Sequence, residues 1–150
     1  MADPIARLFQ DWHRLGGAVL VAHAEPVAPG RSSEEVVAES TAHCRESGRL
    51  MWVTLDWLLR HVDQIDPRRL LEKTRECGDQ SVRGVLCDAA YERNPHPKLA
   101  ELRSACSPPP RLEVFFHRVA GSPLAARPAR ENGLEIFRRW NYLCEELRYL

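Results

Sequence analysis

The sequence predicts an all-α fold: a single-domain multi-helix bundle, or a short array of α-hairpins, with seven or eight helices and at most one short extended segment. Most of the chain carries apolar residues at helical spacing. Each such segment begins at a capping residue or proline and stops near glycine, asparagine or proline. The connections are short, and no Gly- or Ser-rich linker divides the chain. We therefore expect one helical domain over residues 1–150.

The N-terminal part predicts two helices around an extended segment. Residues 3–15 begin with an Asp-Pro start signal and carry an apolar stripe that ends before two glycines. Residues 18–22 are apolar and lead into a proline-rich stretch, which predicts an extended segment covering the core. Residues 32–48 open with the Ser-x-x-Glu spacing of a capping box and close at a glycine, which predicts the second helix.

The segment 51–65 is the most apolar of the predicted helices. Apolar residues form one face, and two tryptophans and a valine cover much of the rest. A helix that is apolar nearly all round belongs in the middle of a fold. We therefore expect this helix to be central, with the first and last helices packed across it, and Leu55, Leu58, Leu59 and Val62 to be nearly fully buried.

Three further helices are predicted next, joined by tight breaks. Residues 66–78 begin with an Asp-Pro signal and end at a glycine. Residues 79–94 restart the helical pattern at once, and an Asn-Pro-His-Pro break separates them from a helix over residues 97–106. This alternation favours antiparallel helix hairpins.

The C-terminal third predicts two further helices. Residues 112–119 could alternate as a strand, but their apolar residues match helical spacing better, so a helix is expected. Residues 123–133 begin and end with turn signals, which predicts a turn of helix followed by a loop. The last helix is expected over residues 134–149, with two apolar stripes.

Composition and charge restrict the function classes. Basic and acidic residues number 21 each, so no overall field draws the chain to nucleic acid or an anionic membrane. Arginine provides all the basic residues except Lys73 and Lys98, which is typical of GC-rich bacterial genomes. Residues 1–15 lack the pattern of a secretory signal, and the longest apolar run, residues 18–22, is too short to span a membrane. A cytoplasmic protein with no membrane association is expected.

Cysteine and histidine positions argue against a metal site or a disulfide framework. The five cysteines are scattered without a Cys-x-x-Cys pair, and we interpret them as reduced thiols near the core. His43 and Cys44 are adjacent, but neighbours on a helix point about 100° apart and do not easily ligate one metal. No phosphate-binding, dinucleotide-binding, zinc-protease or EF-hand motif is present. We expect no metal and no cofactor.

The helix over residues 51–65 carries a candidate polar site at Asp56, Arg60 and His61. Asp56 and Arg60 have i, i+4 spacing and share one face. Beside two tryptophans they could form the floor of a pocket, in which His61 would act as acid or base if it reached the same cleft. The alternative is that Asp56 pairs with Arg60 only to neutralise the edge of the helix.

A weak DNA-binding role is the third hypothesis. The two helices within residues 82–106 could form a helix-turn-helix. Their outward basic residues would be Arg83, Arg93, Lys98 and Arg103. The stiff proline-rich turn does not suit that motif, which usually has a glycine-containing turn. Nucleic acid is therefore not the expected partner.

The last predicted helix carries a candidate interface. Arg138, Trp140, Tyr142 and Tyr149 supply more large side chains than one core-facing stripe can absorb, and such residues are enriched in protein interfaces. We expect homo-oligomerisation through this helix, because symmetric pairing commonly covers such a surface.

These observations rank a small cytoplasmic protein-binding or regulatory module first. The chain shows many apolar helical faces and no reactive constellation. A small-molecule-binding protein or enzyme using Asp56, Arg60 and His61 comes second, and a DNA-binding regulator third.

Overall fold

The computed structural model describes residues 3–19, 30–116 and 135–144 of the chain. The elements, in order, are α1 (Pro4–Arg14), α2 (Ser33–His43), the 3-10 turn η1 (Cys44–Glu46), α3 (Gly48–His61), the 3-10 turn η2 (Val62–Gln64), α4 (Pro67–Cys77), α5 (Gln80–Arg93), α6 (Pro97–Ser104), β1 (Glu113–Val114), α8 (Glu135–Arg139) and β2 (Tyr142–Leu143). The all-α prediction is confirmed, because helices dominate and each strand has two residues.

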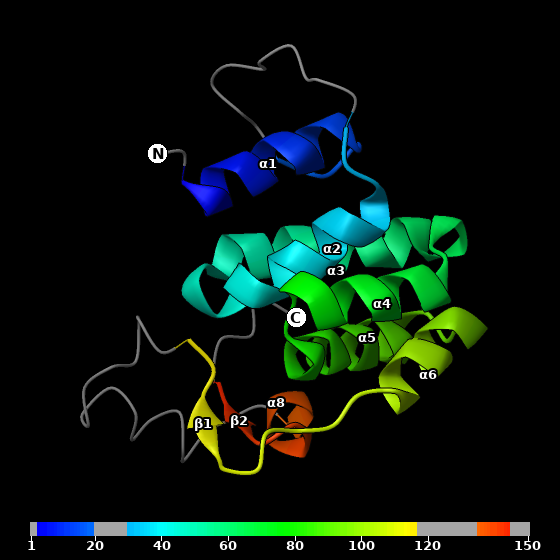
Figure 1. Cartoon of the computed structure of the whole chain (residues 1–150). Helices are drawn as coiled ribbons and strands as arrows, with labels where there is room; N and C mark the ends of the chain where they lie inside the picture. Colours follow the sequence, from blue (N-terminus) through cyan, green and yellow to red (C-terminus); the bar gives the residue numbers. More distant parts are fainter. Residues whose placement is uncertain (1–2, 20–29, 117–134, 145–150) are drawn as a thin grey trace.

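The helices form layers from α1 at one end to α8 and the two strands at the other (Figure 1). Helix α2 packs against α1, α3, α4 and α5, and α5 packs against α2, α3, α6 and α8. Residues 81–90 of α5 are all buried, whereas α3 keeps one face toward solvent. The prediction that residues 51–65 form the central helix is therefore wrong. Helix α5 is enclosed instead, and α8 packs on α5.

Most helix starts follow the predicted caps. Side-chain oxygens of Asp3, Ser32, Asp66 and Asp79 each accept a hydrogen bond from a backbone N–H in the first turn of the helix that follows. Gly48 does not end α2 as expected, since α2 stops at His43. The Ser47 hydroxyl accepts from the Leu50 N–H at 3.2 Å and so starts α3 at Gly48.

Helix α3 buries the expected stripe with one exception. Leu55, Leu58 and Val62 are buried as predicted, but Leu59 is only partly buried, so that part of the prediction is wrong. Trp57 is buried against Trp12 of α1, with ring centroids 5.4 Å apart. Its indole Nε1 donates to the carbonyl of Leu15 at 3.2 Å, which ties the end of α1 to α3.

Residues 112–116, the described part of the helix predicted over residues 112–119, are not helical. Glu113 and Val114 instead make strand β1, which pairs in parallel with β2. The guanidinium of Arg45 donates to the carbonyls of Val114 and Phe115 at 2.8 and 2.9 Å. An extended backbone offers these carbonyls to a distant donor, whereas a helix would use them internally.

The helix predicted over residues 134–149 is much shorter. Helix α8 ends at Arg139, and Asn141 has φ 57, a left-handed conformation that asparagine tolerates and that ends a helix. The chain then enters β2. Residues 145–150, the turn of helix expected within 123–133, and most of the extended segment expected over residues 18–22 lie outside the described residues.

Within the described ranges, no helix combines the length and the apolar character needed to cross a membrane.

Candidate protein-interaction surface

The predicted polar site contains a real ion pair on α3. The Nε and Nη2 atoms of Arg60 donate to Oδ2 of Asp56 at 3.0 and 2.8 Å. The i, i+4 spacing places both side chains on one helix face, and both are partly open to solvent. A solvated pair of this kind contributes at most about 1 kcal/mol to stability. Its main effect is to fix the direction of the guanidinium.

His61 does not join this pair. Adjacent helix positions point about 100° apart, and the His61 ring stacks against Trp57, with centroids 5.0 Å apart. Its Nε2 is buried and has no hydrogen-bond partner among the described residues. The structure therefore brings together Asp56 and Arg60 but separates His61 from them, and the three do not form one acid–base site.

The Asp56–Arg60 pair belongs to a longer exposed surface, which we call the α3 stripe. The members share one side of α3 and η2 at spacings of three and four residues: Arg49, Trp52, Asp56, Leu59, Arg60 and Asp63. Each is exposed or partly exposed, in contrast to the buried residues between them. The side of α3 away from the core thus presents a tryptophan, a leucine and four charged residues.

Trp52 is the most informative member of the α3 stripe. It is 37% exposed, whereas Trp12, Trp57 and Trp140 are buried. At the N-terminal end of the stripe, the guanidinium of Arg49 lies over the ring of Phe9 of α1, 4.9 Å from its centroid. Phe9 is itself only partly buried. In the sequence, Trp52 is one of the residues that make this helix apolar nearly all round and so predict a central position. Its exposure follows from the peripheral position of α3.

The predicted C-terminal interface is not an exposed aromatic cluster. Trp140 and Tyr142 are 7% and 1% exposed, so the expectation that they face a partner is wrong. Arg138 is exposed, and Tyr149 lies outside the described residues. The burial of the two aromatic residues removes the physical reason for homo-oligomerisation through this segment.

One side of α5 receives these aromatic residues. The Trp140 Nε1 donates to Oδ2 of Asp88 at 2.9 Å, and its ring lies directly over Gly84. The hydroxyls of Tyr142 and Ser81 are 2.6 Å apart, and burial raises the pKa of Tyr142. We call Ser81, Gly84 and Asp88 the α5 socket. Their i, i+3, i+7 spacing, which places them on one face of α5, is the signal of this socket in the sequence.

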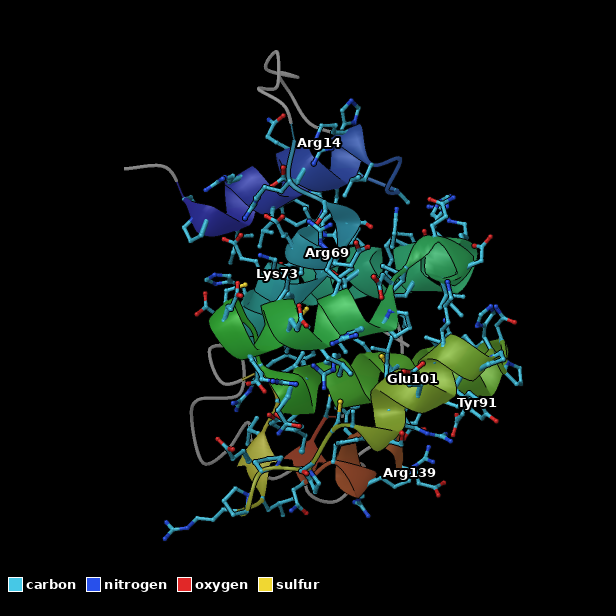
Figure 2. All side chains as sticks on the ribbon, turned by 45° about the vertical axis from the view of Figure 1, so that its right-hand side comes forward. Arg14, Arg69, Lys73, Tyr91, Glu101 and Arg139 are labelled. Carbon is cyan, nitrogen blue, oxygen red and sulfur yellow. The ribbon has the colours of Figure 1, made fainter. Side chains whose placement is uncertain are left out.

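Four basic residues around α5 and α6 are engaged within the chain, whereas Arg93 at the end of α5 is exposed. Lys98 Nζ donates to two backbone carbonyls of η2 and the residue after it, at 2.7 and 2.8 Å. The Arg103 guanidinium lies 4.2 Å from the centroid of the Tyr91 ring, and Arg139 pairs with Asp88 and Glu92. Tyr91 and Arg139 are labelled in Figure 2. The buried Arg83 donates to Cys106 Sγ at 3.2 Å. These contacts give no support to a helix-turn-helix that presents its cations to DNA.

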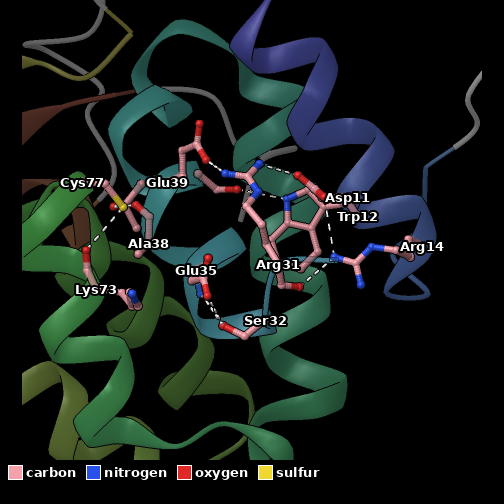
Figure 3. A network of polar contacts seen from close by, with 12 residues as sticks. Asp11, Trp12, Arg14, Arg31, Ser32, Glu35, Ala38, Glu39, Lys73 and Cys77 are labelled. Atoms are coloured by element: carbon pink, nitrogen blue, oxygen red, sulfur yellow. Dashed lines mark hydrogen bonds and ion pairs between the residues drawn. The ribbon is translucent and has the colours of Figure 1, made fainter. Parts of the chain in front are cut away.

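A second polar network holds α1 on α2. The Arg31 guanidinium lies between the carboxylates of Asp11 and Glu39 and pairs with both (Figure 3). Trp12 Nε1 donates to the Ser40 hydroxyl at 3.0 Å. Arg14 donates to the carbonyl of Arg31 at 2.8 Å. Because these contacts join α1 to α2 and to the residue before its N-cap, we assign the network to docking of α1.

The cysteines are free thiols, and the described part of the chain contains no group of three or more histidine, cysteine or acidic residues that could hold a metal ion. Burial raises the pKa of the Cys44 thiol to about 12 and that of Cys87 further still. Thiols held in this protonated state are poor nucleophiles.

Comparison with protein-family models, with curated proteins and with solved structures finds no match to this chain. The function is therefore argued from the geometry of the molecule.

Proposed function

We propose that this chain is a protein-binding module and that the α3 stripe is its contact surface. The observation that carries this proposal is the exposure of Trp52 on a helix whose other sides are buried. Tryptophan and arginine are the residues most enriched at energetic hot spots of protein interfaces. The α3 stripe offers one Trp between Arg49 and Arg60.

The rest of the α3 stripe suits a protein partner. Leu59 is partly buried and extends the apolar area beside Trp52. Arg60 is held in place by Asp56, so little side-chain entropy is lost when the guanidinium meets a partner. Charged residues lie at both ends of the stripe, and Asp56, which Arg60 neutralises, lies between its two apolar residues, Trp52 and Leu59.

The protein-binding proposal has more support than the pocket hypothesis, since His61 is turned away from Asp56 and Arg60. The five free thiols are in keeping with a cytoplasmic location, which we include in the proposal.

The test compares proteins retained by the tagged full-length chain with those retained by Trp52→Ala. The matched control is Leu112→Ala, because Leu112 is 57% exposed and lies outside the α3 stripe. Quantitative mass spectrometry should show at least one protein, an untagged copy of this chain included, that is lost with Trp52→Ala and kept with Leu112→Ala. Circular dichroism must show that both variants are folded. Equal retention by all three chains, or retention of nothing, would overturn the proposal.

A further inference from the structure

The α3 stripe is complementary to itself when reversed. Asp56 lies at its centre. Trp52 and Arg60 lie four residues to either side of Asp56, and Arg49 and Asp63 lie seven residues to either side. Trp52 and Arg60, and likewise Arg49 and Asp63, are therefore pairs of complementary chemistry at equal distances from Asp56, whereas the position opposite Leu59 is the buried Val53.

We propose that the partner of the α3 stripe is a second copy of this chain, paired antiparallel about a two-fold axis at Asp56. This inference rests on the proposed function of the stripe. In the pair, Arg49 of each copy faces Asp63 of the other, and Trp52 of each copy faces Arg60 of the other. Both contacts occur twice, as two-fold symmetry requires.

Charge selects the antiparallel direction. In a parallel pair, Arg49 would face Arg49, Arg60 would face Arg60, and Asp63 would face Asp63. Like charges placed opposite each other are repulsive and exclude such a register. In the antiparallel pair the one self-facing residue is Asp56, and each copy neutralises its own carboxylate with Arg60.

The shape of the stripe provides a place for the tryptophan. Asp56, Leu59, Arg60 and Asp63 have the i, i+3, i+4, i+7 spacing of the four residues that surround a knob in helix–helix packing. Trp52 of the second copy enters this hole at the antiparallel register. There its ring lies against Leu59 and against the guanidinium that Asp56 orients, an arrangement that favours a cation–π contact.

The charges at the ends of the stripe are not placed to stabilise α3 itself. A helix favours anions at its N-terminus and cations at its C-terminus. Arg49 occupies the first turn and Asp63 follows the last turn, which is the opposite arrangement. In the antiparallel pair, Arg49 lies beside the C-terminal end of the other copy's α3, and Asp63 lies beside its N-terminal end. Each helix end then has the charge that it favours nearby.

Sedimentation velocity on the full-length chain up to about 100 μM tests the pairing, a range that detects the weak association expected of a small interface. Wild type should dimerise, and Trp52→Ala should weaken dimerisation at least about tenfold. Arg49→Asp and Asp63→Arg should each weaken it, and the two together should restore it, since the swap rebuilds both ion pairs. Arg68→Asp is the control, because the Arg68 side chain is 89% exposed on α4 and lies outside the stripe.

The outcomes separate this inference from the proposed function. A monomeric wild type, or a double variant that stays as weak as the single ones, overturns the self-pairing. If the tagged chain nevertheless retains another protein that Trp52→Ala does not retain, the proposed function stands without self-pairing. A monomeric chain that retains nothing through Trp52 overturns both. A restored dimer in the double variant supports both.

Discussion

Gly84 shows how a residue without a side chain determines where a distant residue lies. It occupies the middle of α5, where a glycine costs about 1 kcal/mol relative to alanine. A Cβ built on Gly84 would lie 2.7 Å from Cε3 of Trp140 and closer still to two other ring carbons. The loss in helix propensity is thus offset by the close approach of the Trp140 indole, which also reaches Asp88 one turn further along α5.

Gly84→Ala is expected to destabilise the chain by roughly 1 to 3 kcal/mol, because the new methyl group overlaps the indole and forces it out of the α5 socket. The same change at a helix position with space beside it would be stabilising. Urea unfolding of the wild type and the variant measures the difference.

A Trp140→Leu background provides the control for this prediction. With the indole gone, Gly84→Ala should cost less or become stabilising, so the two substitutions should be strongly non-additive. A stabilising effect of Gly84→Ala in the wild type would contradict the observed packing.

The sequence does not reveal this contact for a physical reason. A continuous last helix has one core-facing stripe, which cannot absorb both Trp140 and Tyr142 and so predicts an interface. The chain instead turns at Asn141 and buries both aromatic residues against α5. A glycine at mid-helix beside Ser81 and Asp88 was the local sign that a large side chain approaches, but it does not say which one.

At the scale of elements, α3 separates into a core side and an outer side within two adjacent residues. Leu58 is completely buried, whereas Leu59 belongs to the partly exposed α3 stripe. The periodicity of the segment predicted a helix correctly, but its start was missed, because Ser47 caps α3 at Gly48. That periodicity does not say how many sides of the helix are covered by neighbouring helices.

Leu58→Ala should therefore cost roughly 2 to 5 kcal/mol, and Leu59→Ala clearly less, because only the first leaves a cavity inside the core. Thermal or urea unfolding measures both losses of stability. One low protein concentration is used because association through the α3 stripe then does not contribute. Equal losses for the two leucines would contradict the placement of α3.

The short strands illustrate what local patterns leave open. Residues 112–119 fit a helix on spacing alone, yet Glu113 and Val114 are extended. Their partners are remote: Arg45 binds the carbonyls of Val114 and Phe115, and the Glu113 N–H donates to Asn141 O at 2.9 Å. A tertiary network of this kind overrides a marginal local preference.

At the scale of the whole molecule, the fold class followed from the sequence but its centre did not. The most apolar helix was expected in the middle. Helix α5 is enclosed instead, although it carries Ser81, Arg83 and Asp88, because each of these polar groups has a partner from another segment. Burial of a polar helix depends on such partners, and composition cannot supply their positions.

Stability of the whole fold should decrease at alkaline pH. Burial raises the pKa of Cys44 from 9.0 to about 12 and also raises that of Tyr142. The folded state therefore keeps protons that the unfolded state releases above about pH 9 for the thiol and about pH 10 for the phenol. Each such group lowers the unfolding free energy by up to about 1.4 kcal/mol per pH unit until its folded pKa is reached.

Urea unfolding at about pH 8 and about pH 10 measures this effect, and Cys44→Ala should show a shallower decline than the wild type whatever its stability at the lower pH. Identical slopes for the two proteins would contradict the assignment to Cys44.

The contact in the α5 socket can form only late in the synthesis of the chain. Asp88 and Trp140 are separated by 52 residues in the chain. At translation rates of about 5 to 20 residues per second, α5 exists for about 3 to 10 s before the indole that covers it has been made. During that interval Asp88 and the α5 face that Trp140 covers in the folded protein are without the indole. Asp88, being charged and hydrated, keeps this face from being a purely apolar target for chaperones or for neighbouring nascent chains.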